Sequence, residues 1–281
     1  MPHKLDMEKG TIIITGASGA MGSAAVRAMA AEGCSVIMAC RNLEKGETVR
    51  RDILRDIPQA KLRLMKVDLA SLSSVRSFAS EITDLVNGGS IRLTGLFNNA
   101  GIINRHFKVT EDGYENTMAT NFVGPATLTE MLLPLFEDGS HIVSMISLTC
   151  GLTHRLTGDF LVPDPDKFGQ LSTYAKTKLA LLLYTLDLAQ RTEGRFKVNM
   201  ADPGIVDSNM ISMGRWFDPL ADIVFRPFCK SPERGAAPAV RAMLSDRTAR
   251  FFIGSRCRDI PARYLRMDRT AVTELFRTGK N

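Results

Sequence analysis

Residues 11–22 read Thr-Ile-Ile-Ile-Thr-Gly-Ala-Ser-Gly-Ala-Met-Gly, and this stretch decides the fold class. The apolar run Thr11–Thr15 is typical of a buried strand, and Ala20–Ala31 has apolar residues at helical spacing. The glycines between them permit a tight turn and a close approach of a ligand to the backbone. Because the start of a helix presents unpaired N–H groups, the junction predicts a site for a pyrophosphate. A strand-to-helix turn also uses glycine for backbone reasons alone, so the loop needs support from other residues.

Apolar runs of strand length alternate with helix-length segments along most of the chain. We expect further strands at Ser35–Cys40, Leu62–Val67, Gly95–Asn98, His141–Ser147, Lys197–Asp202 and Phe251–Ile253. We expect further helices at Leu43–Ile57, Ser71–Val86, Tyr114–Leu133, Ser172–Gln190 and from Pro232, with Ser231 as its N-cap. Strands joined through helices imply parallel crossovers and a sheet covered on both faces. No repeat or linker divides the chain, so we expect a single α/β domain over residues 1–281, a doubly wound, Rossmann-like parallel sheet.

Composition excludes several other classes of protein. The chain is 44% hydrophobic and 23% charged, which rules out a coiled coil, a collagen-like rod and a mostly disordered chain. No apolar run approaches the ~20 residues of a membrane helix, so we expect no membrane span. Met1–Gly10 contains no apolar core of a secretory signal, and the five cysteines are scattered, so we expect free thiols and a cytoplasmic location. The four histidines lack metal-ligand spacing, and we expect no metal site.

The net charge of +6 is compatible with an anionic ligand or with nucleic acid. Much of the excess lies late in the chain, between Arg247 and Arg269, where few aromatic residues are interleaved. We therefore favour a solvated basic face over a nucleic-acid surface, and we expect no nucleic-acid partner.

The end of the second expected strand bears on the choice of cofactor. An NAD site usually places Asp or Glu there to bind the ribose 2′-hydroxyl, but residues 38–42 read Met-Ala-Cys-Arg-Asn. The guanidinium of Arg41 can pair with a 2′-phosphate, which a carboxylate would repel. We therefore expect NADP(H) to be preferred over NAD(H). The alternative is an ordinary exposed arginine at a strand end.

Tyr174 and Lys178 lie four residues apart at the start of an expected helix, so they share one helix face. A free tyrosine, with a pKa of about 10, is a poor acid or base at neutral pH. A nearby ammonium favours the phenolate and lowers that pKa towards the working range. The pair alone is weak support for catalysis, because such pairs are common on solvated faces.

Several motifs occur in one order: the Gly-rich loop, Asp68, Asn98-Asn99-Ala100-Gly101, Asn121, Ser147, the Tyr174/Lys178 pair and Pro203-Gly204. With this order the sequence resembles the short-chain dehydrogenase/reductase family over about Thr11 to Phe252. The finer resemblance is to the retinol dehydrogenase-like and WW-domain oxidoreductase-like branch. It rests on Ala39–Asn42, Val67–Leu72, the long insert before Tyr174 and Ser231–Ala236. Members of that branch often have an N-terminal membrane anchor, for which this sequence shows no apolar segment, so a retinoid substrate is not carried over.

The resemblance implies an oxidoreductase that transfers a hydride between a nicotinamide and a carbonyl or alcohol. It implies that Tyr174 is the catalytic acid/base and that Lys178 lowers its pKa and binds the nicotinamide ribose. Ser147 would polarise the substrate carbonyl, and Asn121 would hold a water of the proton relay. The implied cofactor contacts are Gly16, Ser18, Gly19, Met21, Gly22, Arg41, Asn42, Asp68, Leu69, Asn99, Ala100, Gly101, Tyr174, Lys178, Pro203, Gly204, Val206 and Ser208.

The Gly-rich loop departs from the family pattern, because Ala20 stands where the middle glycine of TGxxxGxG is usual. We expect its methyl group to be tolerated if Ala20 already has a helical φ. The alternative is that this residue weakens cofactor binding.

Two variable segments are expected to recognise the substrate. One is the insert Thr149–Leu171, which includes His154, Phe160 and Phe168; the other, residues 209–230, is rich in Met and aromatic residues and would form a lid. Their composition favours an apolar substrate. The alternative is that these side chains pack the segments onto the body, and we expect His154 to be a polar loop residue.

Two other functions remain open. A regulatory or scaffold protein that binds NADP(H) without turnover would not need Asn121, Ser147, Tyr174 and Lys178 together. A nucleotide-sugar epimerase or dehydratase shares the Tyr/Lys pair, but the loop spacing and the Asn-Asn-Ala-Gly run disfavour it. The resemblance also implies a homodimer or homotetramer, because the helices around Asn121 and Tyr174 commonly form subunit contacts in the family.

Overall fold

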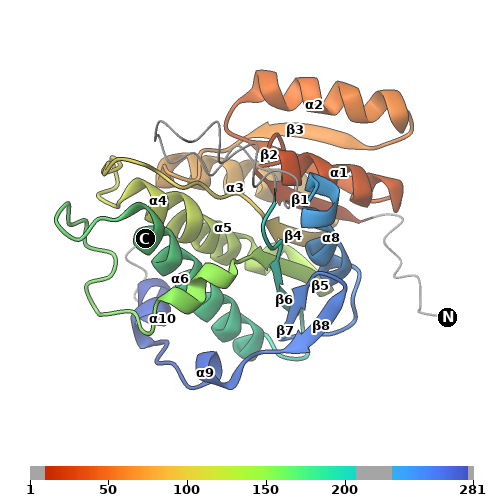
Figure 1. Ribbon diagram of the computed structural model, residues 1–281. Coiled ribbons are helices and arrows are strands. Elements are labelled where there is room, and N and C mark those ends of the chain that lie inside the picture. Colours follow the sequence, from red (N-terminus) through yellow and green to blue (C-terminus); the bar gives the residue numbers. More distant parts are fainter. Residues whose placement is uncertain (1–9, 207–229, 278–281) are drawn as a thin grey trace.

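A computed structural model describes residues 10–206 and 230–277, which are built around a twisted sheet (Figure 1). The sheet has eight strands in the order β3-β2-β1-β4-β5-β6-β7-β8. Neighbouring strands are parallel except β7 and β8, which form an antiparallel pair. The strands are β1 (Thr11–Thr15), β2 (Ser35–Cys40), β3 (Leu62–Lys66), β4 (Leu93–Asn98), β5 (Phe136–Met145), β6 (Lys197–Asp202), β7 (Arg250–Ile253) and β8 (Arg256–Asp259).

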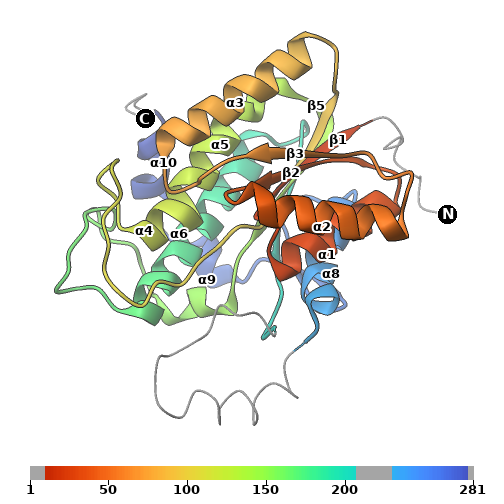
Figure 2. The same cartoon turned by 90° about the horizontal axis from the view of Figure 1, so that it is seen from above.

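Helices cover both faces of this sheet (Figure 2). α3, α5 and α6 lie on one face, and α1, α2 and α8 lie on the other, so the predicted doubly wound α/β architecture is confirmed. The α-helices are α1 (Ala20–Ala31), α2 (Leu43–Asp56), α3 (Leu72–Asn87), α4 (Asn116–Met118), α5 (Gly124–Leu132), α6 (Gln170–Arg191), α8 (Pro232–Met243), α9 (Ala262–Leu265) and α10 (Thr270–Arg277). Shorter turns are the π-helical η2 (Ala119–Val123) and the 3₁₀-helical η3 (Leu133–Leu135) and η4 (Leu148–Leu152).

β1 is the centre of the core, because its side chains alternate between the two faces of the sheet. Ile13 packs with side chains of α3, α5 and α6, whereas Ile12 and Ile14 pack with those of α1 and α8. All three isoleucines are fully buried. The continuous apolar run Thr11–Thr15 is therefore typical of a strand with a helical layer on each side.

The prediction of one continuous helix over Tyr114–Leu133 is wrong. The segment contains α4, the π-helical turn η2 and α5 in succession. At the start of α5, a side chain on Gly124 would overlap the Leu69 carbonyl oxygen, so the chain passes that loop closely. Periodicity detects the apolar face of such a segment but not an extra residue in one turn.

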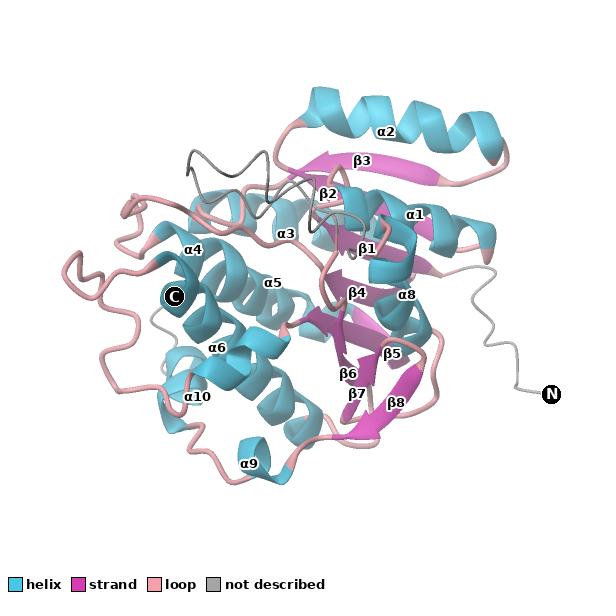
Figure 3. Cartoon of the chain, viewed as in Figure 1, coloured by secondary structure: helices cyan, strands magenta, loops and turns pink. Residues whose placement is uncertain are grey.

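The sequence analysis also gave no strand after β7, whereas β8 forms the edge of the sheet there (Figure 3). β8 is a four-residue edge strand with the sequence Arg-Cys-Arg-Asp, and it has no apolar run to mark it. Arg250 of β7 forms an ion pair with Asp259 of β8. A short, charged edge strand protects the sheet from further pairing, which is why its composition resembles that of a loop.

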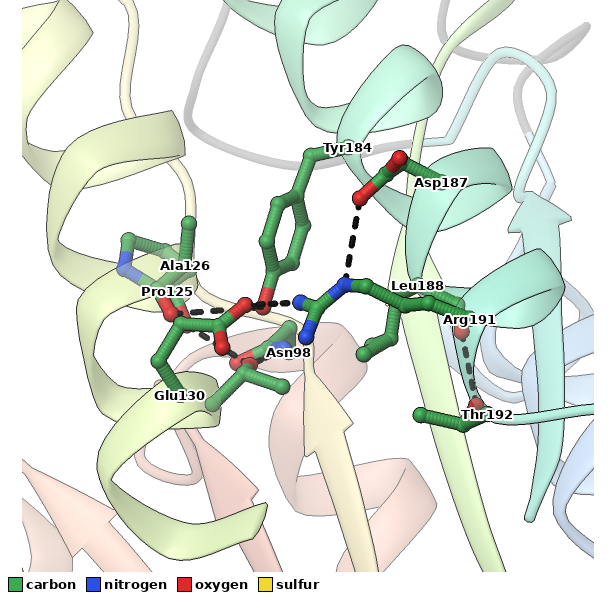
Figure 4. A network of polar contacts seen from close by, with 10 residues as sticks. Asn98, Pro125, Ala126, Glu130, Tyr184, Asp187, Leu188, Arg191 and Thr192 are labelled. Carbon is green, nitrogen blue, oxygen red and sulfur yellow. Dashed lines mark hydrogen bonds and ion pairs between the residues drawn. The ribbon is translucent and has the colours of Figure 1, made fainter. Parts of the chain in front are cut away.

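A polar network fastens α6 to α5 (Figure 4). Tyr184 on α6 donates a hydrogen bond from its hydroxyl to Glu130 Oε1 on α5 at 2.7 Å, and Arg191 forms an ion pair with the same carboxylate. Arg191 Nε also donates to Asp187 Oδ2 at 3.1 Å. At the same helix the ring of Phe276 on α10 lies 5.4 Å from the ring of Tyr184. α6 is therefore held along its length by two neighbouring helices.

Within residues 10–206 and 230–277, no helix is both long enough and apolar enough to cross a membrane. In the same described residues, no group of three or more His, Cys, Asp or Glu side chains is arranged to hold a metal ion.

His141 on β5 makes the stability of the fold depend on pH. Its side chain is 3% exposed, and burial lowers its pKa to about 4, although the nearby Asp246 carboxylate opposes this shift. The ordinary pKa of about 6.5 applies in the unfolded chain, so below that pH the unfolded state binds the proton first and stability falls. We expect the wild type to lose about 2 kcal/mol more unfolding free energy between pH 7.5 and 5 than His141→Gln. Urea unfolding at each pH measures this difference, and equal losses in the two proteins would contradict it.

Candidate active site

A cavity of about 580 Å³ lies at the carboxyl ends of the parallel strands. Open α/β sheets bind ligands at this edge, at the point between β1 and β4 where the strand order changes direction. The structure brings most of the predicted site residues to its wall: Gly16, Ser18, Gly19, Met21, Gly22, Arg41, Asn42, Asp68, Leu69, Asn99, Ala100, Gly101, Ser147, Tyr174, Lys178, Pro203, Gly204 and Val206. Asn121 lies behind this wall, and Ser208 lies outside the described residues, as do residues 209–229 of the expected lid.

The Gly-rich loop needs glycine at two of its positions. Gly16 has a φ of +64°, and a side chain there would come within 2.9 Å of Ala100 Cα. A side chain on Gly22 would overlap the Gly16 carbonyl oxygen. Ala20, in contrast, is the first residue of α1 and is exposed, so its methyl group fits the loop geometry. The N-cap, Gly19, offers no side chain to the first N–H groups of α1, which suits an anionic ligand.

The loop after β4 is held against the Gly-rich loop by Thr15. The Thr15 hydroxyl accepts hydrogen bonds from the N–H groups of Asn99 at 3.0 Å and Ala100 at 3.1 Å. Asn99 Nδ2 donates to the Thr15 carbonyl oxygen at 2.8 Å. The buried Asn99 Oδ1 has no hydrogen-bond partner among the described residues.

Two cations lie on the cavity wall at the end of β2. Arg41 follows the strand directly and is exposed. Asn42 is the N-cap of α2, because its Oδ1 accepts the Lys45 N–H at 2.8 Å. Lys45 also lines the cavity, although it was not among the predicted site residues. Its position in the first turn of α2, directly after Arg41 and the N-cap Asn42, could have indicated that it lies at the same site.

Tyr174 and Lys178 occupy one face of α6 near its start, as predicted from their spacing. Tyr174 is 7% exposed and Lys178 is 2% exposed. Lys178 Nζ lies 5.7 Å from the centre of the Tyr174 ring and donates to the Met145 carbonyl oxygen at 2.8 Å. Ser147 is the N-cap of η4, and its hydroxyl accepts the Thr149 N–H at 3.3 Å. A phenol, a hydroxyl and an ammonium therefore share one end of the cavity.

Burial determines the protonation of this group of side chains. It raises the pKa of Tyr174 to about 12, while a hydrogen bond with Ser147 opposes the rise. It lowers the pKa of Lys178 to about 8, while the negative charge of Asp202 opposes the fall. In the chain alone the pKa of Tyr174 is thus raised, not lowered as the resemblance implies, because desolvation of the phenol is the largest effect on it. At neutral pH the phenol is protonated and can donate a proton.

Asn121 is fully buried in the π-helical turn η2 and does not line the cavity. Its Oδ1 accepts the Ile102 N–H at 2.8 Å, and its Nδ2 donates to the Ile102 carbonyl oxygen at 2.9 Å. Nδ2 also donates to Thr177 Oγ1 at 3.1 Å. Asn121 therefore joins the loop after β4 to α6, which holds that loop against the catalytic face.

The insert before α6 contributes less to the cavity than expected. The ring of Phe160 lies 5.9 Å from that of Phe122, and Phe168 lies 5.8 Å from Phe107. Neither ring lines the cavity, so for both the packing alternative is the better account. Only the ends of the insert reach the wall, through Thr149, Gln170 and Leu171.

Comparisons with known proteins agree on the family and the fold. The family described as short chain dehydrogenase matches residues 10–158. Retinol dehydrogenase 13 of Homo sapiens is 31% identical over 90% of this chain and 78% of its own length. WW domain-containing oxidoreductase of Drosophila melanogaster is 31% identical over 85% of this chain and 59% of its own length. A short chain dehydrogenase of Escherichia coli CFT073, solved in complex with NADPH, has the same fold: TM-score 0.67, 21% identity, covering 91% of this chain and 100% of that one.

Replacing Gly22 by alanine tests the geometry of the Gly-rich loop. The added methyl group would overlap the Gly16 carbonyl oxygen, so we expect Gly22→Ala to lower the free energy of unfolding by about 1–3 kcal/mol. Ala20→Gly is the matched control, with an expected loss of less than about 1 kcal/mol because this methyl group is exposed. Urea unfolding measures both, and equal effects would contradict the geometry.

Proposed function

This chain belongs to the short-chain dehydrogenase/reductase family of oxidoreductases, and we propose that it is an NADP-dependent reductase of apolar carbonyl compounds. One observation supports the proposal above all. The cavity of about 580 Å³ has the Gly-rich loop and Arg41 on its wall together with Ser147, Tyr174 and Lys178. A phosphate-binding loop and a proton-donating phenol thus face the same space, as hydride transfer from a bound cofactor to a carbonyl requires.

The lining of the cavity fits a nicotinamide dinucleotide. The unblocked N-terminus of α1 suits its pyrophosphate. Asp68 and Leu69 line the cavity where the adenine would lie, and Pro203, Gly204 and Val206 line it where the nicotinamide would lie. When bound, the cofactor supplies the hydride.

The chain's own residues would handle the carbonyl oxygen and the proton. The Ser147 and Tyr174 hydroxyls would donate hydrogen bonds to the carbonyl oxygen, and Tyr174 would deliver its proton to the developing alkoxide. Lys178 would favour the phenolate left behind, because its ammonium lies beside the ring. Asn121 would hold the neighbouring loop in place through its two bonds to Ile102.

Tyr174 is protonated at neutral pH because burial raises its pKa to about 12, so its phenol carries the proton that carbonyl reduction needs. Two exposed apolar side chains at the catalytic end support an apolar substrate. Leu171 is 55% exposed and Ile205 is 71% exposed, and both line the cavity.

The first experiment is to titrate the purified protein with NADPH and with NADH, following nicotinamide fluorescence. Turnover is then measured against aromatic ketones, quinones, short and long aldehydes and steroids. We expect tight NADPH binding and reduction of at least one apolar carbonyl. NADPH binding without turnover across the panel would favour a cofactor-binding regulatory or scaffold protein instead. Binding of neither cofactor would overturn the proposal.

Tyr174→Phe removes the proposed proton donor. We expect turnover to fall by about 10²–10⁴-fold with NADPH binding nearly unchanged, because general acid catalysis contributes effects of that size. Tyr184→Phe is the matched control, since Tyr184 is a buried tyrosine on the same helix whose hydroxyl bonds Glu130 instead. This control should keep its turnover and lose about 1 kcal/mol of stability. Retained turnover in Tyr174→Phe would contradict the assignment.

Arg41 and Lys45 are proposed to bind the 2′-phosphate that distinguishes NADPH from NADH. We expect Arg41→Ala and Lys45→Ala each to weaken NADPH binding by about 10–100-fold, the value of a charge-assisted hydrogen bond, and to leave NADH binding unchanged. Arg51→Ala on the exposed face of α2 is the control, because Arg51 does not line the cavity. Equal losses for both cofactors would argue against a role in cofactor preference.

A further inference from the structure

Asp202, the last residue of β6, is a buried carboxylate beside the catalytic end of the cavity. Its side chain is 1% exposed, and it does not line the cavity wall. Burial of a carboxylate is costly unless hydrogen bonds and opposite charges surround it. Burial raises the Asp202 pKa, and backbone N–H groups together with two lysines oppose that rise. The groups around Asp202 therefore offset part of the cost of burying its carboxylate.

The hydrogen bonds of Asp202 connect two separate loops. Near the ends of β5 and β6, the Ile146 N–H donates to the Ala201 carbonyl oxygen at 2.9 Å. The chains then diverge, one into the loop with Ser147 and the other into the loop with Gly204. Asp202 Oδ1 accepts the Gly204 N–H at 2.6 Å. The backbone N–H of Leu148, the residue after Ser147, also acts on this carboxyl group and lowers its pKa. The Asp202 side chain therefore lies between the two loops.

The charges of two ammonium groups act on the carboxyl group of Asp202. Lys178 on α6 is buried, and its Nζ donates to the carbonyl oxygen of Met145, at the end of β5. Lys230 donates from Nζ to the Pro203 carbonyl oxygen at 3.1 Å and lies against the face of Gly204. The charges of both lysines favour the ionised form of Asp202, and its charge favours the ammonium of Lys178 in return. Asp202 Oδ2 has no hydrogen-bond partner among the described residues.

We propose that Asp202 is a positioning residue for carbonyl reduction: it holds the Ser147 loop and the Gly204 loop at a fixed separation and supplies the counter-charge of Lys178. This inference rests on the proposed function, because it assigns the two loops to the carbonyl and to the nicotinamide. A fixed separation keeps the hydroxyl of Ser147 aimed at the carbonyl oxygen while the hydride donor lies against the other loop. The counter-charge keeps Lys178 protonated beside Tyr174.

Two substitutions separate the hydrogen bond from the charge. Asp202→Asn retains an oxygen that can accept the Gly204 N–H but removes the negative charge, whereas Asp202→Ala removes both. We expect Asp202→Ala to lower kcat by about 10–100-fold, the order of loss that misplacement of reacting groups causes. Asp202→Asn should lower kcat less. NADPH affinity, measured by fluorescence titration, should change by less than about threefold in both variants.

The pH profile of kcat/KM provides a readout that lost stability alone would not move. The groups that face Asp202 are Tyr174 and Lys178 on α6, Cys150 on η4 and Lys230 before α8. Loss of the negative charge lowers the pKa of Tyr174 and that of Lys178, since Asp202 raises both. Carbonyl reduction needs both groups protonated, so we expect the alkaline limb to move to lower pH in Asp202→Asn.

Asp84→Asn is the control, because it makes the same substitution at an exposed position of α3. If Asp202→Asn and Asp202→Ala lower the melting temperature but keep wild-type kcat and the wild-type alkaline limb, the inference is wrong and Asp202 is structural only. A wild-type chain that binds NADPH but reduces no carbonyl would instead remove the proposed function, and this inference with it. The two failures are distinct because the wild-type panel is measured first.

Discussion

β1 pairs in parallel with β2 on one edge and with β4 on the other. The strands that follow β1 are therefore added on one side of it, and the strands from β4 onward are added on the other side. Helices that follow β1 and β4 must then cross on opposite faces, which leaves the carboxyl ends of the strands uncovered between them. Thr15 stands at that point and bonds both N–H groups of the neighbouring loop. The position of the cavity follows from this switch in strand order, and every residue proposed to bind cofactor is placed relative to it.

The chemistry at the other end of the cavity depends on removing charged groups from water. The phenol of Tyr174 and the ammonium of Lys178 are both buried, and desolvation shifts each pKa towards the neutral form. The carboxylate of Asp202 opposes the shift of Lys178 and adds to that of Tyr174. Burial therefore keeps the phenol of Tyr174 protonated, and the charge of Asp202 favours the protonated form of Lys178 beside it.

The sequence predicted most of what is local and little of what depends on tertiary contact. Thr11–Thr15 and Ala20–Ala31 could be recognised because their periodicities are strong, and the Tyr174/Lys178 pair because i and i+4 share a helix face. β8 was not predicted because a polar edge strand has no apolar pattern. Asp202 was not singled out for another reason: the Leu148 N–H and the Lys178 ammonium that act on it are distant in the sequence, and only the folded sheet brings them near. Likewise, no sequence pattern could show that Phe160 packs on Phe122 instead of lining the cavity.

The contacts of α9 and α10 also set an order in which the protein can be completed during synthesis. Tyr264 on α9 lies 3.2 Å, hydroxyl to sulfur, from Cys150 on η4, and Phe276 on α10 packs on Tyr184 of α6. The strands and loops proposed to bind the adenosine half of the cofactor are all made before residue 102. A growing chain emerges from the ribosome N-terminal end first. The residues proposed to contact the adenosine half therefore leave the ribosome before Ser147, Tyr174 and Lys178, and the segment 262–277, which contacts Cys150 and Tyr184, leaves last among the described residues.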